Sequence, residues 1–65
     1  MDKRLGMLNL MQEMANGIVA VEAVAEYVAE VAEEFDADGQ RDTANVLRMV
    51  GRNQSYAGEW VTRFG

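Results

Sequence analysis

Glutamates at helical spacing are the residues of this sequence with the greatest potential for chemistry. From position 22 to position 34 a glutamate recurs at every fourth residue, and one more stands beside the last of them. Residues four apart lie one above the other on a helix, so these carboxylates would share one acidic surface. We interpret that surface as a binding site for a basic protein partner. The predicted partner-binding residues are Glu22, Glu26, Tyr27, Glu30, Glu33 and Glu34.

The alternative for this acidic surface is a solvated helix face with no binding role. Like charges four residues apart repel by about 0.2–0.5 kcal/mol per pair, so helix formation alone does not explain the pattern. In the alternative, the arginines of the second half of the chain partly neutralise the glutamates. Those arginines are Arg41, Arg48 and Arg52.

Metal binding and catalysis are poorly supported by the residue types. The sequence has no His and no Cys, whereas metal sites in helical bundles combine Glu with His. The run that starts at Asp36 is similar to the beginning of a calcium-binding loop, but the twelfth position, which should be a bidentate Glu, is Leu47. Without His, the hydroxyl side chains lack the usual general base. We therefore expect no catalytic residue, no metal, no cofactor and no enzymatic activity.

Two arginines provide a different candidate site. Arg48 and Arg52 are one helical turn apart, and guanidinium groups bind phosphates and carboxylates in a bidentate manner. Together with Asn53 and Gln54, they predict, as an alternative function, a site for a small anionic ligand or nucleotide at a subunit interface. The other interpretation is that these arginines form surface ion pairs with the carboxylates of the first half of the chain.

Length and charge limit the classes of function. The chain of 65 residues makes one domain, 1–65. Its net charge of −5 disfavours nucleic acid, whose phosphates attract basic proteins. No apolar stretch approaches the roughly 20 residues that cross a bilayer, and no signal peptide is visible. The simplest expectation is a cytoplasmic protein that binds neither membrane nor nucleic acid.

The apolar spacing predicts an all-α fold of two antiparallel helices. Apolar residues alternate at intervals of three and four over residues 4–36, which is typical of a heptad-patterned helix. A turn follows at 37–40, where Gly39 suits a left-handed C-cap. The second helix runs over 41–63, continuous or kinked near Gly51. At its C-terminal end, Tyr56, Trp60 and Phe64 form an aromatic stripe, which we expect to pack against the methionines near the N-terminus. The alternative is that these aromatic residues anchor a binding partner.

A hairpin of two helices cannot bury so wide an apolar surface. Each helix would have only one neighbour, so half of the apolar stripe would stay exposed to water. Two hairpins packed face to face would close a four-helix bundle, which predicts a homodimer. The predicted oligomer interface consists of Met7, Met11, Met14, Ile18, Val21, Val28 and Phe35.

These features favour a small, non-enzymatic regulator or inhibitor that binds a protein partner as a homo-oligomer. Small acidic proteins of this kind are common among the products of phages and mobile elements. The alternatives are the ligand-binding or sequestering protein built on the arginine pair, and a purely structural assembly subunit.

Overall fold

The structure, a computed structural model, describes residues 3–65 and has helices but no strand in that range. Four α-helices are preceded or separated by two short 3-10 turns, η1 (Lys3–Gly6) and η2 (Val21–Ala23). The helices are α1 (Met7–Ala15), α2 (Ala25–Ala37), α3 (Arg41–Arg52) and α4 (Tyr56–Phe64). The predicted all-α class is confirmed.

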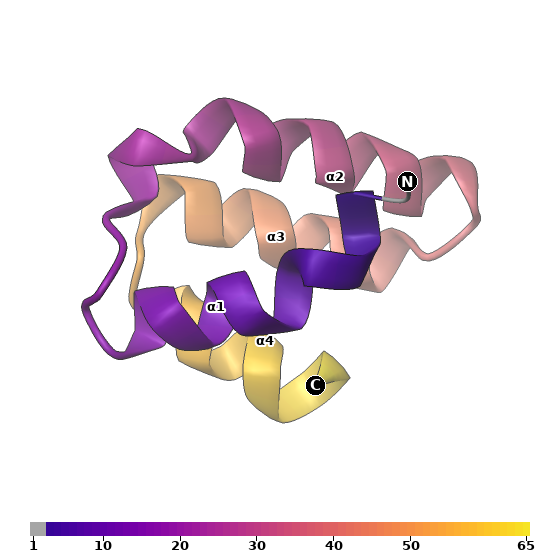
Figure 1. Ribbon diagram of the computed structural model, residues 1–65. Coiled ribbons are helices and arrows are strands. Elements are labelled where there is room, and N and C mark those ends of the chain that lie inside the picture. Colours follow the sequence, from indigo (N-terminus) through magenta and orange to yellow (C-terminus); the bar gives the residue numbers. More distant parts are fainter. Residues whose placement is uncertain (1–2) are drawn as a thin grey trace.

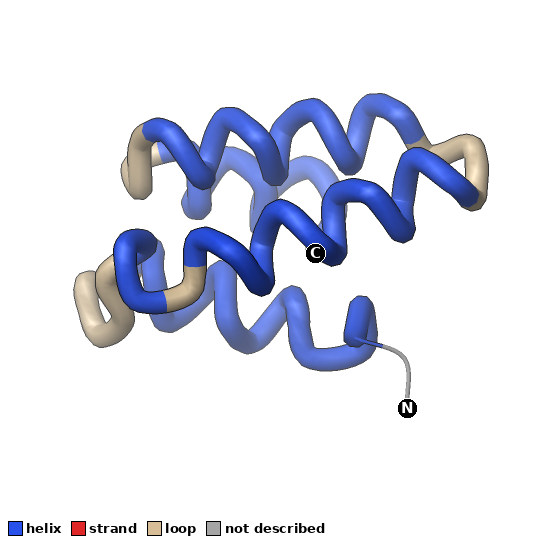
Figure 2. Tube along the Cα trace, turned by 90° about the horizontal axis from the view of Figure 1, so that it is seen from above, coloured by secondary structure: helices blue, strands red, loops and turns tan. Residues whose placement is uncertain are grey.

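The four helices pack as two pairs. The helices α2 and α3 are antiparallel neighbours that a short turn connects, and α1 packs against α4 (Figure 1). The view from above shows the same two pairs (Figure 2). Contacts between α3 and α4 connect the pairs, so the chain builds a four-helix core from one copy of itself.

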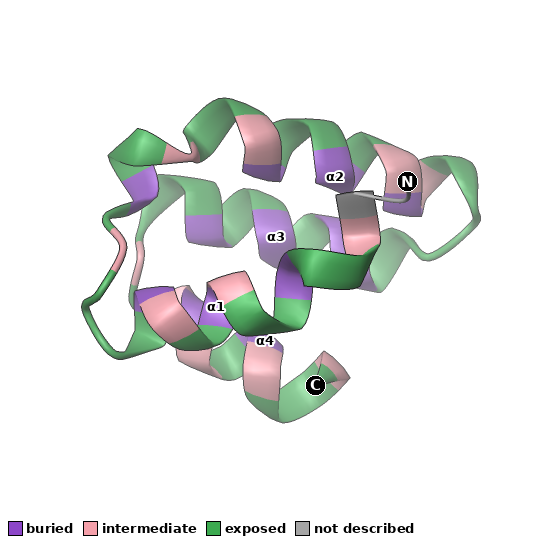
Figure 3. Cartoon of the chain, viewed as in Figure 1, coloured by how far each residue is buried: buried purple, intermediate pink, exposed green. Residues whose placement is uncertain are grey.

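The apolar core lies between the two pairs, where the buried faces of the helices meet (Figure 3). Met7, Met11 and Met14 of α1 are at most 1% exposed, and Trp60 of α4 is 4% exposed. The predicted packing of the aromatic stripe near the methionines is therefore confirmed for Trp60. The other buried apolar residues are Val21, Val28, Val31, Ala32, Phe35, Ala44, Val46, Leu47, Val50 and Ala57.

The chain does not form the single helix predicted over residues 4–36, because it turns back after Ala15. Gly17 adopts a left-handed conformation with φ +74°. Its N–H donates to the carbonyl oxygen of Met14 (3.1 Å), and the N–H of Ile18 donates to that of Glu13 (2.8 Å). These two bonds make a Schellman motif, which satisfies the last carbonyls of α1 and ends the helix.

The same motif ends α2, where the turn was predicted. Gly39 has φ +82°, and its N–H donates to the carbonyl oxygen of Asp36 (3.0 Å). The N–H of Gln40 donates to the carbonyl oxygen of Phe35 (2.9 Å). The predicted left-handed cap at Gly39 is therefore confirmed, and only residues 38–40 separate the two helices.

The helix predicted over 41–63 is divided into α3 and α4 and is not continuous. Asn53 has an extended backbone (φ −150°, ψ 114°) that no helix can contain. Its side-chain oxygen accepts a hydrogen bond from the N–H of Ser55 at 3.0 Å. The break therefore lies just after Gly51, the position at which a kink was expected, and it lets α4 fold back to reach α1.

The predicted oligomer interface is mostly buried within one chain. Six of its seven residues are at most 9% exposed, and the exception is Ile18, which is 69% exposed in the loop after α1. The surface that gave the reason for a dimer is thus already covered by the chain's own helices. The homodimer stays a prediction, but folding no longer requires it.

We expect the midpoint of thermal unfolding to be the same over a wide range of protein concentrations. A protein that folds only as a dimer becomes more stable as its concentration rises, whereas a fold with an internal core does not. Circular dichroism over an approximately hundredfold concentration range, with light scattering in parallel, makes the measurement. A midpoint that rises steadily with concentration would show that the core is completed by a second copy.

Candidate functional site

Four of the six predicted partner-binding residues surround one hollow at the start of α2. The hollow has a volume of about 590 Å³. Its walls include three carboxylates and one phenol, together with the small apolar residues between them. We call it the acidic hollow, and its lining residues are Glu22, Ala23, Val24, Ala25, Glu26, Tyr27 and Glu30.

The turn η2 gives the acidic hollow its shape. Glu22 lies within this turn and Glu26 in the first turn of α2, where the positive end of the helix dipole favours a carboxylate. Glu30 follows one helical turn later. Tyr27 is half-buried and packs against the core, so its ring is held in place at the edge of the carboxylates.

The two remaining predicted partner-binding residues lie outside the hollow. Glu33 is exposed farther along α2, and Glu34 is half-buried beside it. Within residues 3–65, Glu22, Glu26 and Glu33 have no ion-pair partner. The acidic surface therefore keeps most of its charge uncompensated.

Of the three arginines that were expected to neutralise the glutamates, only Arg48 forms an ion pair within residues 3–65, and its partner is an aspartate. Arg48 donates to Asp36 at the C-terminal end of α2, with 2.6 Å between the guanidinium nitrogen and the carboxylate oxygen. It also lies 3.4 Å from the side-chain oxygen of Asn45. Arg4 forms an ion pair with Asp38. These two ion pairs lie near the C-terminal end of α2, and the acidic hollow lies at its N-terminal end.

The four residues of the alternative ligand site are not brought together. Arg48 and Arg52 line a shallow hollow of about 300 Å³ between α2 and α3. Asn53 bonds to the backbone of the α3–α4 turn. Gln54 faces a different part of the molecule, where its amide donates to the carbonyl oxygen of Met14 and accepts from the backbone N–H of Val21. Its role is to connect backbone segments.

Sequence reasoning missed a third hollow, which lies at the other end of the molecule. Its walls come from η1, α1, α2, α3, α4 and the turn before α3, so no local pattern could have revealed it. The one signal in the sequence was the aromatic stripe, which was expected to pack in the core, with a binding anchor as its alternative role. Trp60 is indeed core, while Phe64 is half-buried and lines the hollow.

Other site types find no support among the described residues. In the part of the chain that the structure describes, no three His, Cys, Asp or Glu side chains are placed to hold a metal ion. No helix there has both the length and the apolar character needed to cross a bilayer. Comparison of the chain with protein-family models, curated proteins and solved structures gave no match.

Proposed function

We propose that the protein is a non-enzymatic regulator or inhibitor that binds a basic protein partner through the acidic hollow. The observation that carries this proposal is the convergence of Glu22, Glu26 and Glu30 around one concavity with Tyr27. Lys and Arg side chains of a partner would enter the hollow and pair with the carboxylates. The half-buried Tyr27 supplies the aromatic surface that is enriched at the centres of protein interfaces.

The negative charge of the protein favours a basic protein as the partner over other classes of macromolecule. The net charge of −5 and the glutamates Glu22, Glu26 and Glu33, which have no ion-pair partner within residues 3–65, would attract basic surfaces and accelerate their association. The same charge repels nucleic acids. A basic protein is therefore the class of partner that the electrostatics of this face select.

The size of an ordinary interface indicates how much of α2 the partner would cover. A standard interface buries about 800 Å² on each side, which is about one fifth of the 4113 Å² surface of this chain. The acidic hollow alone is too small for that area. The partner would also have to cover neighbouring exposed residues of α2, such as Ala29 and Glu33.

Reversing the charge of the hollow should abolish binding to the partner. We expect Glu22→Lys combined with Glu26→Lys to reduce affinity at least about tenfold, because truncated or reversed interfacial charge pairs cost about 2–5 kcal/mol. Host proteins captured on the immobilised chain would be identified, purified and titrated against both forms by calorimetry. Added salt should weaken the wild-type complex.

A matched control distinguishes the effect of changing the acidic hollow from the effect of changing the net charge. Glu13→Lys combined with Asp42→Lys also changes the net charge from −5 to −1, since each replacement adds two charges. Asp42 lies in the first turn of α3 as Glu26 does in that of α2, so the helix-dipole effect is similar. The control should retain the partner. Equal loss in both variants, or equal binding by both, would contradict the acidic hollow as the binding site.

A further inference from the structure

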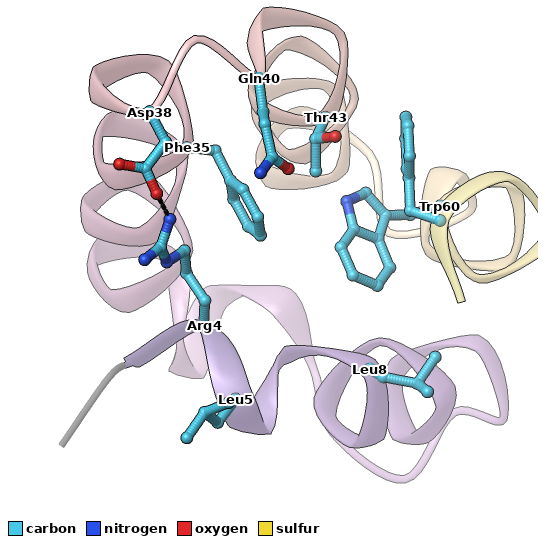
Figure 4. A pocket seen from close by; sticks show the side chains of 9 residues that line it. Arg4, Leu5, Leu8, Phe35, Asp38, Gln40, Thr43 and Trp60 are labelled. Carbon is cyan, nitrogen blue, oxygen red and sulfur yellow. Dashed lines mark ion pairs between the residues drawn. The ribbon is translucent and has the colours of Figure 1, made fainter.

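The hollow that sequence reasoning missed is a pocket of about 550 Å³, within the range of small-molecule sites. We call it the Trp60 pocket. It opens between η1 and α1 on one side and the α2–α3 turn and α4 on the other (Figure 4). Its lining residues are Arg4, Leu5, Leu8, Phe35, Asp38, Gln40, Thr43, Trp60 and Phe64.

The walls of the Trp60 pocket are about half apolar and half polar, and they are partly open to water. Leu5 is 78% exposed and Leu8 is 39% exposed, although both are large apolar residues. Opposite them, the rings of Trp60 and Phe64 pack with 5.7 Å between their centroids at 52°. Apolar side chains that converge on a concavity and stay exposed are typical of a binding site.

One polar group in this pocket has no partner. The indole Nε1 of Trp60 is buried, yet it donates to no acceptor among the described residues. A buried donor without an acceptor costs about 1–3 kcal/mol. Figure 4 shows this nitrogen turned toward the side of the pocket where Gln40 and Thr43 lie. Of these two neighbours, Thr43 is buried and Gln40 is exposed, so an acceptor atom would have to approach the buried indole nitrogen from the side of Gln40.

The charged groups of the pocket compensate each other. Arg4 forms an ion pair with Asp38 on the far side of Phe35 from Trp60 (Figure 4), and its guanidinium lies 5.7 Å from the centroid of the Phe35 ring. This pair leaves the pocket without a net charge. A ligand that carried a charge would lose hydration and find no opposite charge without breaking the pair.

We propose that the Trp60 pocket binds a neutral small molecule with an apolar body and one acceptor oxygen. The apolar body would lie between Leu5, Leu8 and the aromatic rings. The oxygen would accept the hydrogen bond of the Trp60 indole, which removes the cost of the unpaired donor. This site is separate from the acidic hollow and does not depend on the proposed function.

The single tryptophan of the chain allows a direct test by nuclear magnetic resonance. Trp60 gives the only indole N–H signal, so its position reports on this pocket alone. Acetophenone carries a ring and a ketone oxygen, and we expect it to move the signal downfield in a saturable manner, with a Kd on the order of millimolar. Ethylbenzene lacks the oxygen and benzoate adds a charge, so each should bind about tenfold more weakly.

Two sets of variants complete the test. Leu5→Ser combined with Leu8→Ser should abolish the acetophenone shift, because both residues are exposed and form the apolar wall. Ile18→Ser, at a residue that is 69% exposed and outside the pocket, should leave it unchanged. Trp60→Phe removes the donor, and the signals of the Leu8 methyl groups should then show equal binding of acetophenone and ethylbenzene.

Specific outcomes would overturn the proposal. These are the absence of a saturable shift with acetophenone up to about 10 mM, equal binding of all three compounds to the wild type, or an unchanged preference for acetophenone in Trp60→Phe. If Trp60→Phe does not fold, the comparison of the three compounds on the wild type and on the leucine variant decides the matter.

Discussion

Leu47→Ala should lower the free energy of unfolding by about 2–5 kcal/mol, which is the range for removing a buried leucine side chain. Leu47 is fully buried and belongs to α3, the helix that contacts both α2 and α4. Domains of this size rarely have more than about 3–5 kcal/mol of stability. We therefore expect the variant to be largely unfolded at 25 °C, as measured by urea denaturation followed by circular dichroism.

The control for this prediction lies two residues away. Met49 is on the same helix but is 38% exposed, and Met49→Ala should change the stability by no more than about 0.5 kcal/mol. Similar stability losses in both variants would mean that α3 does not bury the face that the structure shows. A Leu47→Ala variant as stable as the wild type would contradict the internal four-helix core itself.

The helical class and one of its turns could be predicted because both have local causes. The chain contains no Pro, and its apolar residues keep helical spacing in most segments. Gly39 stands where an acidic, polar run interrupts that spacing, so its cap was visible in the sequence. The structure places it there with φ +82°.

The break after Ala15 could not be predicted in the same way because the heptad spacing continues through it. Met14, Ile18 and Val21 keep the intervals of one helix face. However, Met14 lies in the last turn of α1, Ile18 is exposed in a loop and Val21 starts η2. The spacing shows which apolar residues could share one helix face, but it does not show whether one continuous helix carries them. Gly17 was the only local sign, and an interior glycine costs only about 1 kcal/mol in a helix.

The break after Ala15 lets the folded chain bury its apolar residues without a second copy. A helix over residues 4–36 would be about 50 Å long at 1.5 Å per residue, whereas the longest dimension of the chain is 29 Å. Folding back at Gly17 places Met7, Met11 and Met14 beside α4. The methionines that suggested a dimer interface are therefore the centre of the chain's own core.

The candidate sites show the same difference: a site formed by residues close in sequence could be predicted, and a site formed by the tertiary fold could not. Glu26 and Glu30 could be grouped from their spacing alone, because helix geometry brings them to one face, whereas the turn η2 places Glu22 beside them. Glu33 and Glu34 do not line the hollow, since η2 and only the start of α2 form it, and their partner-binding role stays a prediction. The Trp60 pocket is made by six segments, and only the tertiary fold brings them together.

Gln54→Leu should lower the free energy of unfolding by about 1–3 kcal/mol, because the part-buried N–H of Val21 loses its acceptor and the Met14 carbonyl keeps only its bond from the Gly17 N–H. The Gln54 amide nitrogen donates to the carbonyl oxygen of Met14 at 2.8 Å, and its oxygen accepts from the N–H of Val21 at 3.0 Å. These two bonds hold both ends of the loop that follows α1. Leucine has a similar volume but can form neither of them.

Hydrogen exchange and a matched variant identify the cause of that loss. The amide of Val21 should exchange faster with solvent in Gln54→Leu, because its acceptor is gone. Gln54→Glu keeps an acceptor for Val21 but loses the donor to Met14, so its stability should lie between those of the leucine variant and the wild type. Gln12→Leu makes the same chemical change on the exposed side of α1 and should be nearly neutral. If Gln54→Leu matched Gln12→Leu in stability and in exchange of the Val21 amide, Gln54 would not hold the loop, and a role in ligand binding would again be open for it.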